Sequence, residues 1–174
     1  MSYKEEVIKA MELLAEDPRT LFIGQTVLYP GGFIYNTLLT IPKEKKVEVP
    51  IFEDTQLGMC IGLSLLGYIP ICIFPRMDFL ICAMNQLVNH LDKIEEMSLG
   101  RFKSGVIIRT MIGATEPLYP GIQHCSDYTG ALSELLKHIR VKKLEEEEEI
   151  VKEYSRALRS QESTVLIELG QRMR

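Results

Sequence analysis

Glu53 is the residue whose position offers the clearest acid–base chemistry. It follows the apolar residues 49–52 and begins a segment in which Gly58 and Gly62 are spaced about one helical turn apart. A carboxylate at a strand end, beside apolar side chains, can be partly desolvated and can share a proton with a ligand nitrogen. The simpler interpretation is that Glu53 and Asp54 only complement the positive end of a helix dipole. The pattern alone leaves both interpretations open.

His124 is the second candidate, because it ends a long segment that is rich in glycine and proline. Long loops of this kind are often functional, and an imidazole at a loop-to-helix junction can act as a general acid or base near neutral pH. The simpler interpretation is an exposed loop histidine. Cys125 follows directly, so a small cysteine-dependent hydrolase is an alternative, although sequence neighbours rarely have the geometry of a nucleophile and its base.

Several common site motifs are absent from the sequence. It contains no Gly-x-Gly-x-x-Gly, no Gly-x-x-x-x-Gly-Lys-Ser/Thr and no Gly-x-Ser-x-Gly, which argues against dinucleotide, P-loop and hydrolase-elbow sites. There are 3 histidines and no His-Glu-x-x-His, so we expect no metal site built by this chain alone.

Composition limits the broad class of protein. The chain has 174 residues, of which 46% are hydrophobic, which is enough for one sizeable core. With 20 Lys and Arg against 24 Asp and Glu, the formal charge of -4 offers no reason to expect nucleic acid. The 4 cysteines form no Cys-x-x-Cys pair, and Cys60, Cys72 and Cys82 lie in apolar stretches suited to burial. No export signal is visible, so we expect a reducing, cytoplasmic location.

One stretch is long and uncharged enough to raise the question of a membrane span. Residues 55–75 carry no charge, but Gly67 and Pro70 interrupt the stretch, and its period changes from helical to a continuous apolar run. The pattern therefore predicts a buried helix followed by a buried strand.

Strands and helices alternate along the whole chain. A capping box of Ser2 and Glu5 predicts a first helix that ends at Asp17. Further helices are predicted from 53, over 78–98, 130–138 and 145–158, and strands at 21–24, 47–50, 69–74, 106–108, near 141 and at 164–168. Uniformly apolar strands joined by helical crossovers predict an α/β fold with a mostly parallel sheet and helices on both faces, in a single domain over residues 1–174. Ligands of such sheets bind where strand ends meet helix starts.

The order of these pieces resembles a known family. Residues 49–71 resemble the Pro-Ile-Ser-Glu segment, glycine-rich helix and Gly-x-x-Pro-Val strand of thiamine diphosphate enzymes. The resemblance is to the pyrimidine-binding domain of transketolases and of the β subunits of 2-oxo acid dehydrogenase first components. Further matches follow in the same order at 22–27, 31–33, 78–79, 85–88, 106–110, 123–124 and 164–168.

The resemblance implies roles for five residues. Glu53 matches the glutamate that hydrogen-bonds a ring nitrogen of the aminopyrimidine and favours the imino form, which removes the proton from the thiazolium carbon. His124 matches the active-site histidine, which serves proton transfer to the substrate or its adduct. Phe79 and Met77 fall where the family places aromatic residues against the pyrimidine ring. Gln25 stands at the position of an acidic residue after the first strand, and the resemblance implies that it is a cofactor-binding residue together with Glu53, Phe79 and Met77.

The resemblance also has departures. Besides Gln25 and Met77, Phe52 replaces a serine before the glutamate, and Cys125 replaces a serine after the histidine. The Gly-Asp-Gly and downstream Asn that hold magnesium and diphosphate in the family are absent, and we expect the family's carboxyl-terminal transketolase domain to be absent too. The resemblance therefore implies a partner chain, a diphosphate-binding α-type subunit that holds Mg2+, in an α2β2-like assembly.

Taken together, these features predict the pyrimidine-binding subunit of a two-chain thiamine diphosphate enzyme. Such an enzyme cleaves a carbon–carbon bond next to a carbonyl, and we prefer transketolase-like transfer of a two-carbon unit over decarboxylation or dehydrogenation of a 2-oxo acid. The alternative is a non-catalytic α/β scaffold or regulatory subunit, which the departures at Gln25, Phe52 and Met77 favour.

Overall fold

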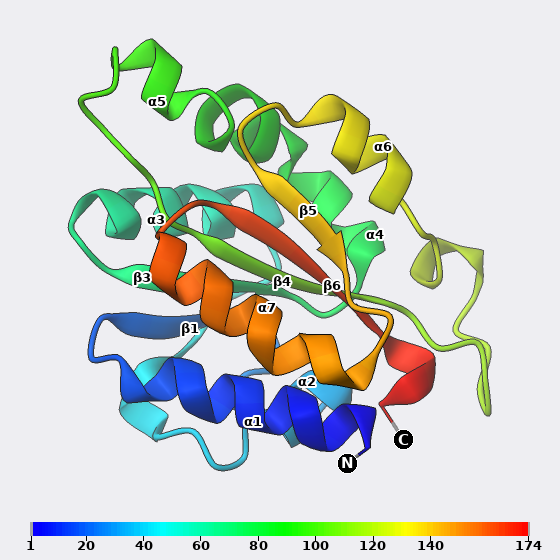
Figure 1. Ribbon diagram of the computed structural model, residues 1–174. Helices are drawn as coiled ribbons and strands as arrows, with labels where there is room; N and C mark the ends of the chain where they lie inside the picture. The colour runs from blue at the N-terminus through cyan, green and yellow to red at the C-terminus, as the bar shows by residue number, and fades with distance from the viewer. Residues whose placement is uncertain (1, 174) are drawn as a thin grey trace.

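The core of the molecule is a six-stranded sheet in which every pairing is parallel (Figure 1). The computed structural model describes residues 2–173. The strand order is β2-β1-β3-β4-β6-β5. The strands are β1 (Thr20–Gly24), β2 (Lys46–Glu48), β3 (Ile69–Phe74), β4 (Ile107–Ile112), β5 (Arg140–Lys143) and β6 (Thr164–Leu169). The predicted α/β class with a parallel sheet is confirmed.

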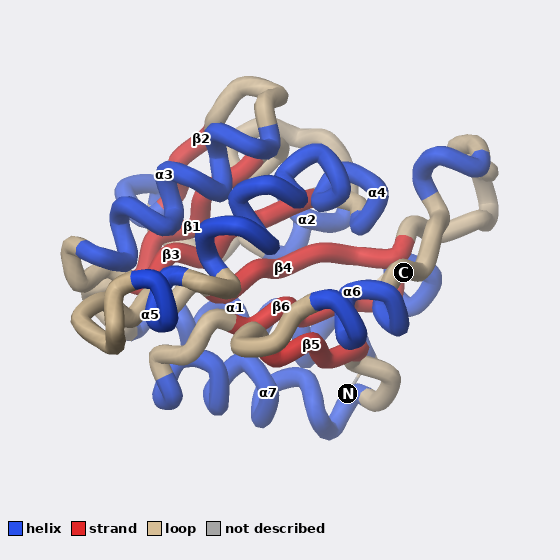
Figure 2. The backbone as a smooth tube through the Cα atoms, turned by 90° about the horizontal axis from the view of Figure 1, so that it is seen from above, coloured by secondary structure: helices blue, strands red, loops and turns tan. Residues whose placement is uncertain are grey.

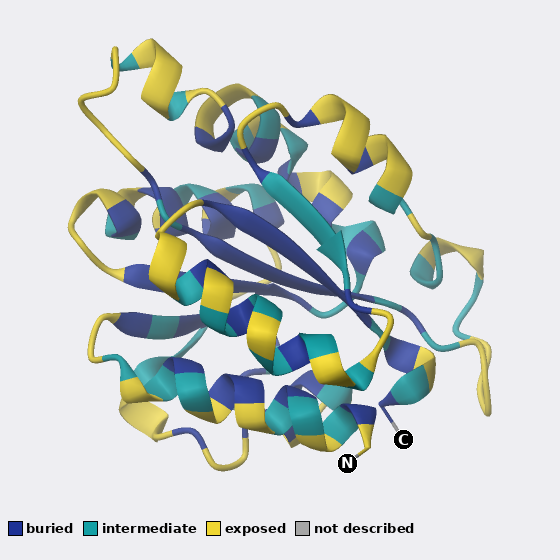
Figure 3. Cartoon of the chain, viewed as in Figure 1, coloured by how far each residue is buried: buried dark blue, intermediate teal, exposed yellow. Residues whose placement is uncertain are grey.

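Helices cover both faces of this sheet, because parallel strands need crossovers that bury both sides (Figure 2). One face carries α1 (Tyr3–Glu16), α2 (Phe33–Thr37) and α7 (Glu147–Ser160). The other carries α3 (Glu53–Leu65), α4 (Met77–Leu80), α5 (Ile94–Met97) and α6 (Thr129–Leu135). Each face has its own hydrophobic cluster, and the central strands between the clusters are almost wholly buried (Figure 3).

Two local predictions are confirmed by their contacts. The backbone N–H of Glu5 donates to Ser2 Oγ (3.3 Å), and the backbone N–H of Ser2 donates to Glu5 Oε2 (2.8 Å), which is the predicted capping box of α1. The uncharged stretch 55–75 contains most of α3 and the whole of β3, as predicted. Among residues 2–173 no helix has both the length and the apolar character that a bilayer crossing needs.

The helix predicted over 78–98 is instead four short helical pieces. After α4 come a 3-10 turn (Ile81–Ala83), a π-helical segment (Asn85–Leu91) and α5. In the wider π turn, the backbone N–H of Asp92 donates to Leu87 O (2.9 Å). The Asp92 side chain then points into the protein. There its carboxylate accepts the backbone N–H groups of residues 137–139. Periodicity alone could not predict this, because the partners lie 45 or more residues away.

Smaller differences have similar tertiary causes. Strand β4 continues to Ile112, beyond the predicted end at 108, because its register with β6 runs through Leu169. Helix α6 ends at Leu135 instead of continuing to 138, since the next N–H groups bond to Asp92. Cys60 and Cys72 are buried as expected, but Cys82 is exposed, so its predicted burial is wrong.

Candidate functional site

The site lies where the carboxyl ends of β1 and β3 meet. The chain leaves β1 towards β2 on one side and returns in β3 on the other, so the direction of strand succession reverses between these neighbours. Such reversal points are where ligands bind in open α/β sheets, because the two loops diverge and leave a crevice. A cavity of about 200 Å³ lies here. Its lining residues are Thr26, Gly31, Gly32, Phe33, Ile34, Asn36, Pro75, Arg76 and Met111.

Glu53 is the first residue of α3 and is buried, with 8% of its surface exposed. No hydrogen bond within residues 2–173 involves its carboxylate, and neither carboxylate oxygen is among the buried atoms that lack a partner. Gln25 holds the chain on either side of it: Gln25 Nε2 donates to Pro50 O (3.3 Å) and to Gln56 Oε1 (3.0 Å). Gln25 therefore fixes the segment that carries Glu53.

The start of α3 is tied to the rest of its layer by two further contacts. Gln56 Nε2 donates to Ile73 O (2.9 Å) in β3. Gln86 Nε2 donates to Asp54 Oδ2 (3.2 Å), which joins α3 to the π-helical segment. Asp54 thus has a protein partner, whereas its neighbour Glu53 keeps its carboxylate free for a ligand.

His124 ends a 3-10 turn (Ile122–His124) and packs on Phe79. The two rings meet edge to face, with centroids 5.5 Å apart and planes at 78°. His124 Nδ1 is buried and has no hydrogen-bond partner among the described residues. The backbone is locked in place, since Arg76 Nη1 donates to His124 O (3.1 Å), and a Cβ at Gly113 would lie 1.9 Å from that same oxygen. Only glycine at 113 lets the loop close in this way.

Helix α4 holds the His124 loop at two more points. Asp78 accepts the Ser126 N–H at 3.4 Å, and Met77 Sδ accepts the Tyr128 N–H at 3.3 Å. Met77 is fully buried, so it supports the loop from below and presents no surface to a ligand in this structure. Its predicted contact with a pyrimidine ring stays a prediction, and the half-exposed position of Phe79 makes that residue the better candidate.

The Cys125 thiol is not bonded to the His124 imidazole in the described chain, as it would be in a cysteine hydrolase. Its thiol donates to Ala114 O at 3.7 Å, and no hydrogen bond among the described residues joins it to the His124 imidazole. A nucleophile needs its base within hydrogen-bond reach. The arrangement therefore gives the cysteine-hydrolase alternative no support.

The sequence has relatives among 2-oxo acid dehydrogenase subunits, although no family model matches it. The pyruvate dehydrogenase E1 component subunit beta of Chaetosphaeridium globosum is 32% identical over 116 residues, which is 65% of this chain and 35% of the relative. The mitochondrial subunit of Caenorhabditis elegans is 29% identical over 133 residues, covering 74% and 37%. The 3-methyl-2-oxobutanoate dehydrogenase subunit beta of Mycobacterium tuberculosis is 28% identical over 124 residues, covering 68% and 34%. The matches span about a third of the length of these curated relatives.

A solved structure shares the fold along nearly the whole chain. It is described as "Split gene transketolase, inactive beta4 tetramer", and it matches 99% of this chain and 52% of its own with a TM-score of 0.73 and 21% identity. In sequence and in fold, the chain resembles the pyrimidine-binding domain of thiamine diphosphate enzymes. The resemblance predicted from the sequence is confirmed.

The free polar groups of this pyrimidine-domain fold suit such a cofactor. An aminopyrimidine ring needs a carboxylate to hydrogen-bond its nitrogen, and Glu53 is buried without a protein partner. For the metal, the described residues contain one cluster of three possible ligands, Glu146–Glu148. These carboxylates begin α7, the last long helix, and complement its dipole.

Glu48 is a residue of the site region that sequence reasoning missed. Its carboxylate accepts the backbone N–H groups of Thr26 (2.7 Å), Val27 (2.8 Å) and Leu28 (2.8 Å). These three bonds shape the loop that leaves β1, where Thr26 has a positive φ of 58°. The only signal in the sequence was an acidic residue inside a strand, which by itself does not identify a partner.

A second polar group that the sequence analysis missed is buried under the other face. Arg109 donates to both carboxylate oxygens of Glu168 (2.8 and 2.9 Å) and to Thr37 (2.8 Å), and Tyr154 donates to Glu168 (2.6 Å). Burial alone would lower the pKa of Arg109, but the charge of Glu168 holds it above its ordinary value. Burial, followed by the charge of Glu168, raises the pKa of Tyr154. This network joins β4, β6, α2 and α7, so we assign it a structural role.

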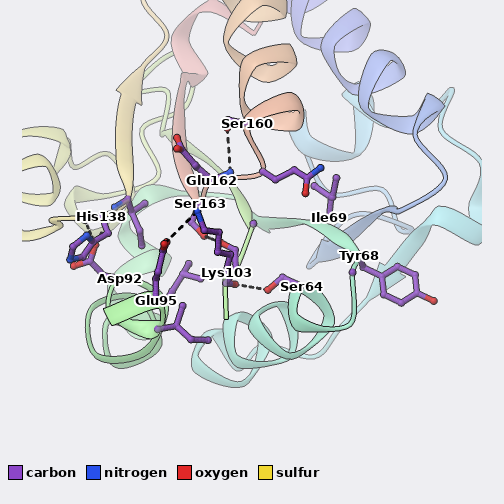
Figure 4. A pocket seen from close by; sticks show the side chains of 17 residues that line it. Ser64, Tyr68, Ile69, Asp92, Glu95, Lys103, His138, Ser160, Glu162 and Ser163 are labelled. Atoms are coloured by element: carbon purple, nitrogen blue, oxygen red, sulfur yellow. Dashed lines mark hydrogen bonds and ion pairs between the residues drawn. The ribbon is translucent and has the colours of Figure 1, made fainter. Parts of the chain in front are cut away.

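A larger cavity, of about 510 Å³, lies at the opposite, amino end of the strands (Figure 4). Its polar side chains bond mainly to one another or to nearby backbone: Ser64 pairs with Ser104, Lys103 pairs with Glu95 (3.4 Å), and Asp92 accepts backbone N–H groups. No side-chain polar atom that lines it is both buried and without a partner among residues 2–173. Volume alone therefore does not make this cavity the candidate site.

Proposed function

We propose that the chain is the pyrimidine-binding subunit of a two-chain thiamine diphosphate enzyme that cleaves a carbon–carbon bond next to a carbonyl. The observation that carries the proposal is Glu53, a residue only 8% exposed at the carboxyl edge of a parallel sheet, whose carboxylate is bonded to no residue of the described chain. The resemblance to β-type subunits of this enzyme class supports it. Bound thiamine diphosphate supplies the electron sink for the carbanion that forms when the bond breaks.

Each site residue then has one task. Glu53 hydrogen-bonds a ring nitrogen of the aminopyrimidine and holds or releases its proton. Gln25 keeps Glu53 in place through its bonds to Pro50 and Gln56. Phe79 packs against the pyrimidine ring and also orients His124, whose imidazole moves a proton to or from the substrate.

The proposal includes a partner chain that holds the diphosphate and Mg2+. The chain has no Gly-Asp-Gly, so the cofactor would lie between two subunits. Large apolar side chains are exposed on the segments around the site, as a subunit interface requires. These are Tyr29, Ile51, Phe52, Leu118, Tyr119 and Ile122. We propose an α-type partner in an α2β2-like assembly.

Two reactions fit this chemistry. Transfer of a two-carbon unit, which the sequence analysis preferred, is supported by the fold neighbour's description as a split-gene transketolase. Decarboxylation of a 2-oxo acid is supported by the names of the sequence relatives, which are pyruvate and 3-methyl-2-oxobutanoate dehydrogenase subunits. Both break a bond next to a carbonyl, and both need the same carboxylate.

The test is reconstitution with the α-type partner. Titration calorimetry should show magnesium-dependent thiamine diphosphate binding by the pair and weak or no binding by the chain alone. Release of CO2 from pyruvate would identify decarboxylation, and transfer from a ketose phosphate to an aldose would identify transketolase chemistry. Full activity of Glu53→Gln in the pair would refute the catalytic assignment. Cofactor binding with neither reaction would favour the non-catalytic alternative.

A further inference from the structure

The cavity between the β1 and β3 loops contains one positively charged side chain, Arg76. It follows β3 directly and lines the 200 Å³ cavity together with Thr26, Gly31, Gly32 and Asn36. Gly32 has φ of 134°, and a Cβ there would meet no atom within 4 Å, so the backbone leaves open space beside the loop. The cavity therefore combines room, a cation and neutral polar neighbours.

Arg76 differs from the other buried or half-buried arginines because it has no acidic partner. Arg109, Arg140 and Arg172 each pair with a carboxylate. None of the ion pairs among residues 2–173 includes Arg76, whose guanidinium makes one hydrogen bond, from Nη1 to His124 O. A guanidinium has five N–H donors, so four are left for a ligand.

Two acidic groups on segments beside the cavity, Glu48 and Asp78, already accept backbone N–H groups, and no carboxylate of residues 2–173 lines the cavity itself. The Glu48 carboxylate accepts three backbone N–H groups of the β1 loop, and the Asp78 carboxylate accepts the Ser126 N–H. Arg76 is fixed against His124 O and beside Gly113, where a Cβ would lie 2.4 Å from its Nη1. A partly desolvated, fixed guanidinium binds an oxyanion well, because its planar fork donates two parallel hydrogen bonds.

We propose that Arg76 is a specificity residue that binds the anionic group, a carboxylate or a phosphate, of the keto substrate. The inference rests on the proposed function, since it assumes that the substrate reacts beside His124. Arg76 Nη1 donates to the backbone oxygen of that histidine (3.1 Å), so an anion held by the free donors of Arg76 would lie beside the loop that carries the imidazole, although His124 itself does not line the cavity. The cavity also lies on the β1–β3 reversal point, where the topology independently predicts a ligand.

The first test uses the full chain alone and follows the Nε–H resonance of Arg76 by NMR. Inorganic phosphate and sodium pyruvate are the two probes, titrated separately at low ionic strength. We expect a saturable shift with at least one probe, and binding about tenfold weaker or worse in Arg76→Gln. Arg101→Gln is the matched control, because Arg101 is exposed and belongs to no ion pair among the described residues, and it should bind like the unaltered chain.

The two probes separate the two sources of the anion. Tighter phosphate binding identifies a sugar phosphate, and tighter pyruvate binding identifies a 2-oxo acid; either supports the proposal. Arg76→Lys keeps the charge without the fork and should fall between the unaltered chain and Arg76→Gln. No saturable shift with either probe, or equal affinity in a well-folded Arg76→Gln, overturns it.

A second test in the reconstituted pair separates this inference from the proposed function. Arg76→Gln should raise KM for the anionic substrate about tenfold or more and leave the affinity for thiamine diphosphate unchanged. Loss of cofactor binding in the unaltered pair would be a failure of the proposed function alone. Unchanged KM in an active Arg76→Gln pair would be a failure of the Arg76 inference alone.

Discussion

Both ends of the sheet have cavities, but the polar side chains at the two ends differ in whether they have hydrogen-bond partners within the protein. At the amino end, the larger cavity is lined by side chains that hydrogen-bond one another or the backbone, as the carboxylate of Asp92 does. At the carboxyl end, Glu53 and Arg76 keep unused hydrogen-bonding capacity, and His124 Nδ1 has no partner among the described residues. A buried polar group without a partner costs stability, and a ligand at the carboxyl end could complete His124 Nδ1, although Arg109 Nη1 and Thr110 Oγ1 of strand β4 are also buried without a partner among residues 2–173. The difference locates the function better than volume does.

The variant Glu53→Gln tests most directly whether the unpartnered polar groups at the carboxyl end serve function. If the carboxylate works as a proton-sharing group, its loss should lower kcat of the reconstituted pair by about 10²–10⁴-fold. The free energy of unfolding of the chain should change little, because no protein hydrogen bond is lost. Asp54→Asn is the control, since that carboxylate bonds Gln86 and should leave kcat nearly unchanged. A large loss of stability in Glu53→Gln would show that the residue is structural instead.

Glu168→Gln tests the opposite case, a buried carboxylate whose partners are all protein. Removing its charge leaves the Arg109 guanidinium buried beside a neutral amide, which should lower the free energy of unfolding by about 3–5 kcal/mol. Urea denaturation of the chain measures this. A loss below about 1 kcal/mol would contradict the structural role of the network.

Asp92→Ala tests whether the polar groups at the amino end serve stability alone. Its carboxylate accepts three backbone N–H groups before β5, so truncation should lower the free energy of unfolding by about 1–3 kcal/mol. Thermal and urea unfolding measure the loss. Cofactor binding by the pair should not change, and a change would mean that the two ends of the sheet are coupled.

Asp17→Asn gives the smallest effect, because its ion pair with Arg19 is partly exposed. The Arg19 side chain hydrogen-bonds Asp17 and lowers its pKa from 3.8 to about 2. A lowered folded-state pKa means that the stabilisation is present above pH 3.8 and is lost as the pH falls towards 2. After solvent screening, we expect a loss of less than about 1 kcal/mol at pH 7. Unfolding curves of the two chains should converge as the pH falls below about 2, and a difference that persists there would exclude this ion pair as its cause.

The position of Glu53 was predictable, because it depends on the sequence pattern of its immediate neighbours. The pattern predicts Glu53 at the start of a helix after a strand, and the structure has it as the first residue of α3. The neighbourhood of Arg76 was not predictable. It depends on a hydrogen bond across 48 residues and on a reversal of strand order that periodicity does not encode.

The sequence by itself determined the succession of strands and helices, the parallel α/β class and the resemblance to a pyrimidine-binding domain. These follow from apolar periodicity and helix caps, which act over a few neighbouring residues. Only the tertiary structure decided which polar groups are satisfied. It pairs Arg109 with Glu168, turns Met77 into the core beneath the loop, and leaves Glu53 and Arg76 available. The physical reason is that hydrogen-bond partners far apart in the chain are selected by sheet register and packing, which no local pattern specifies.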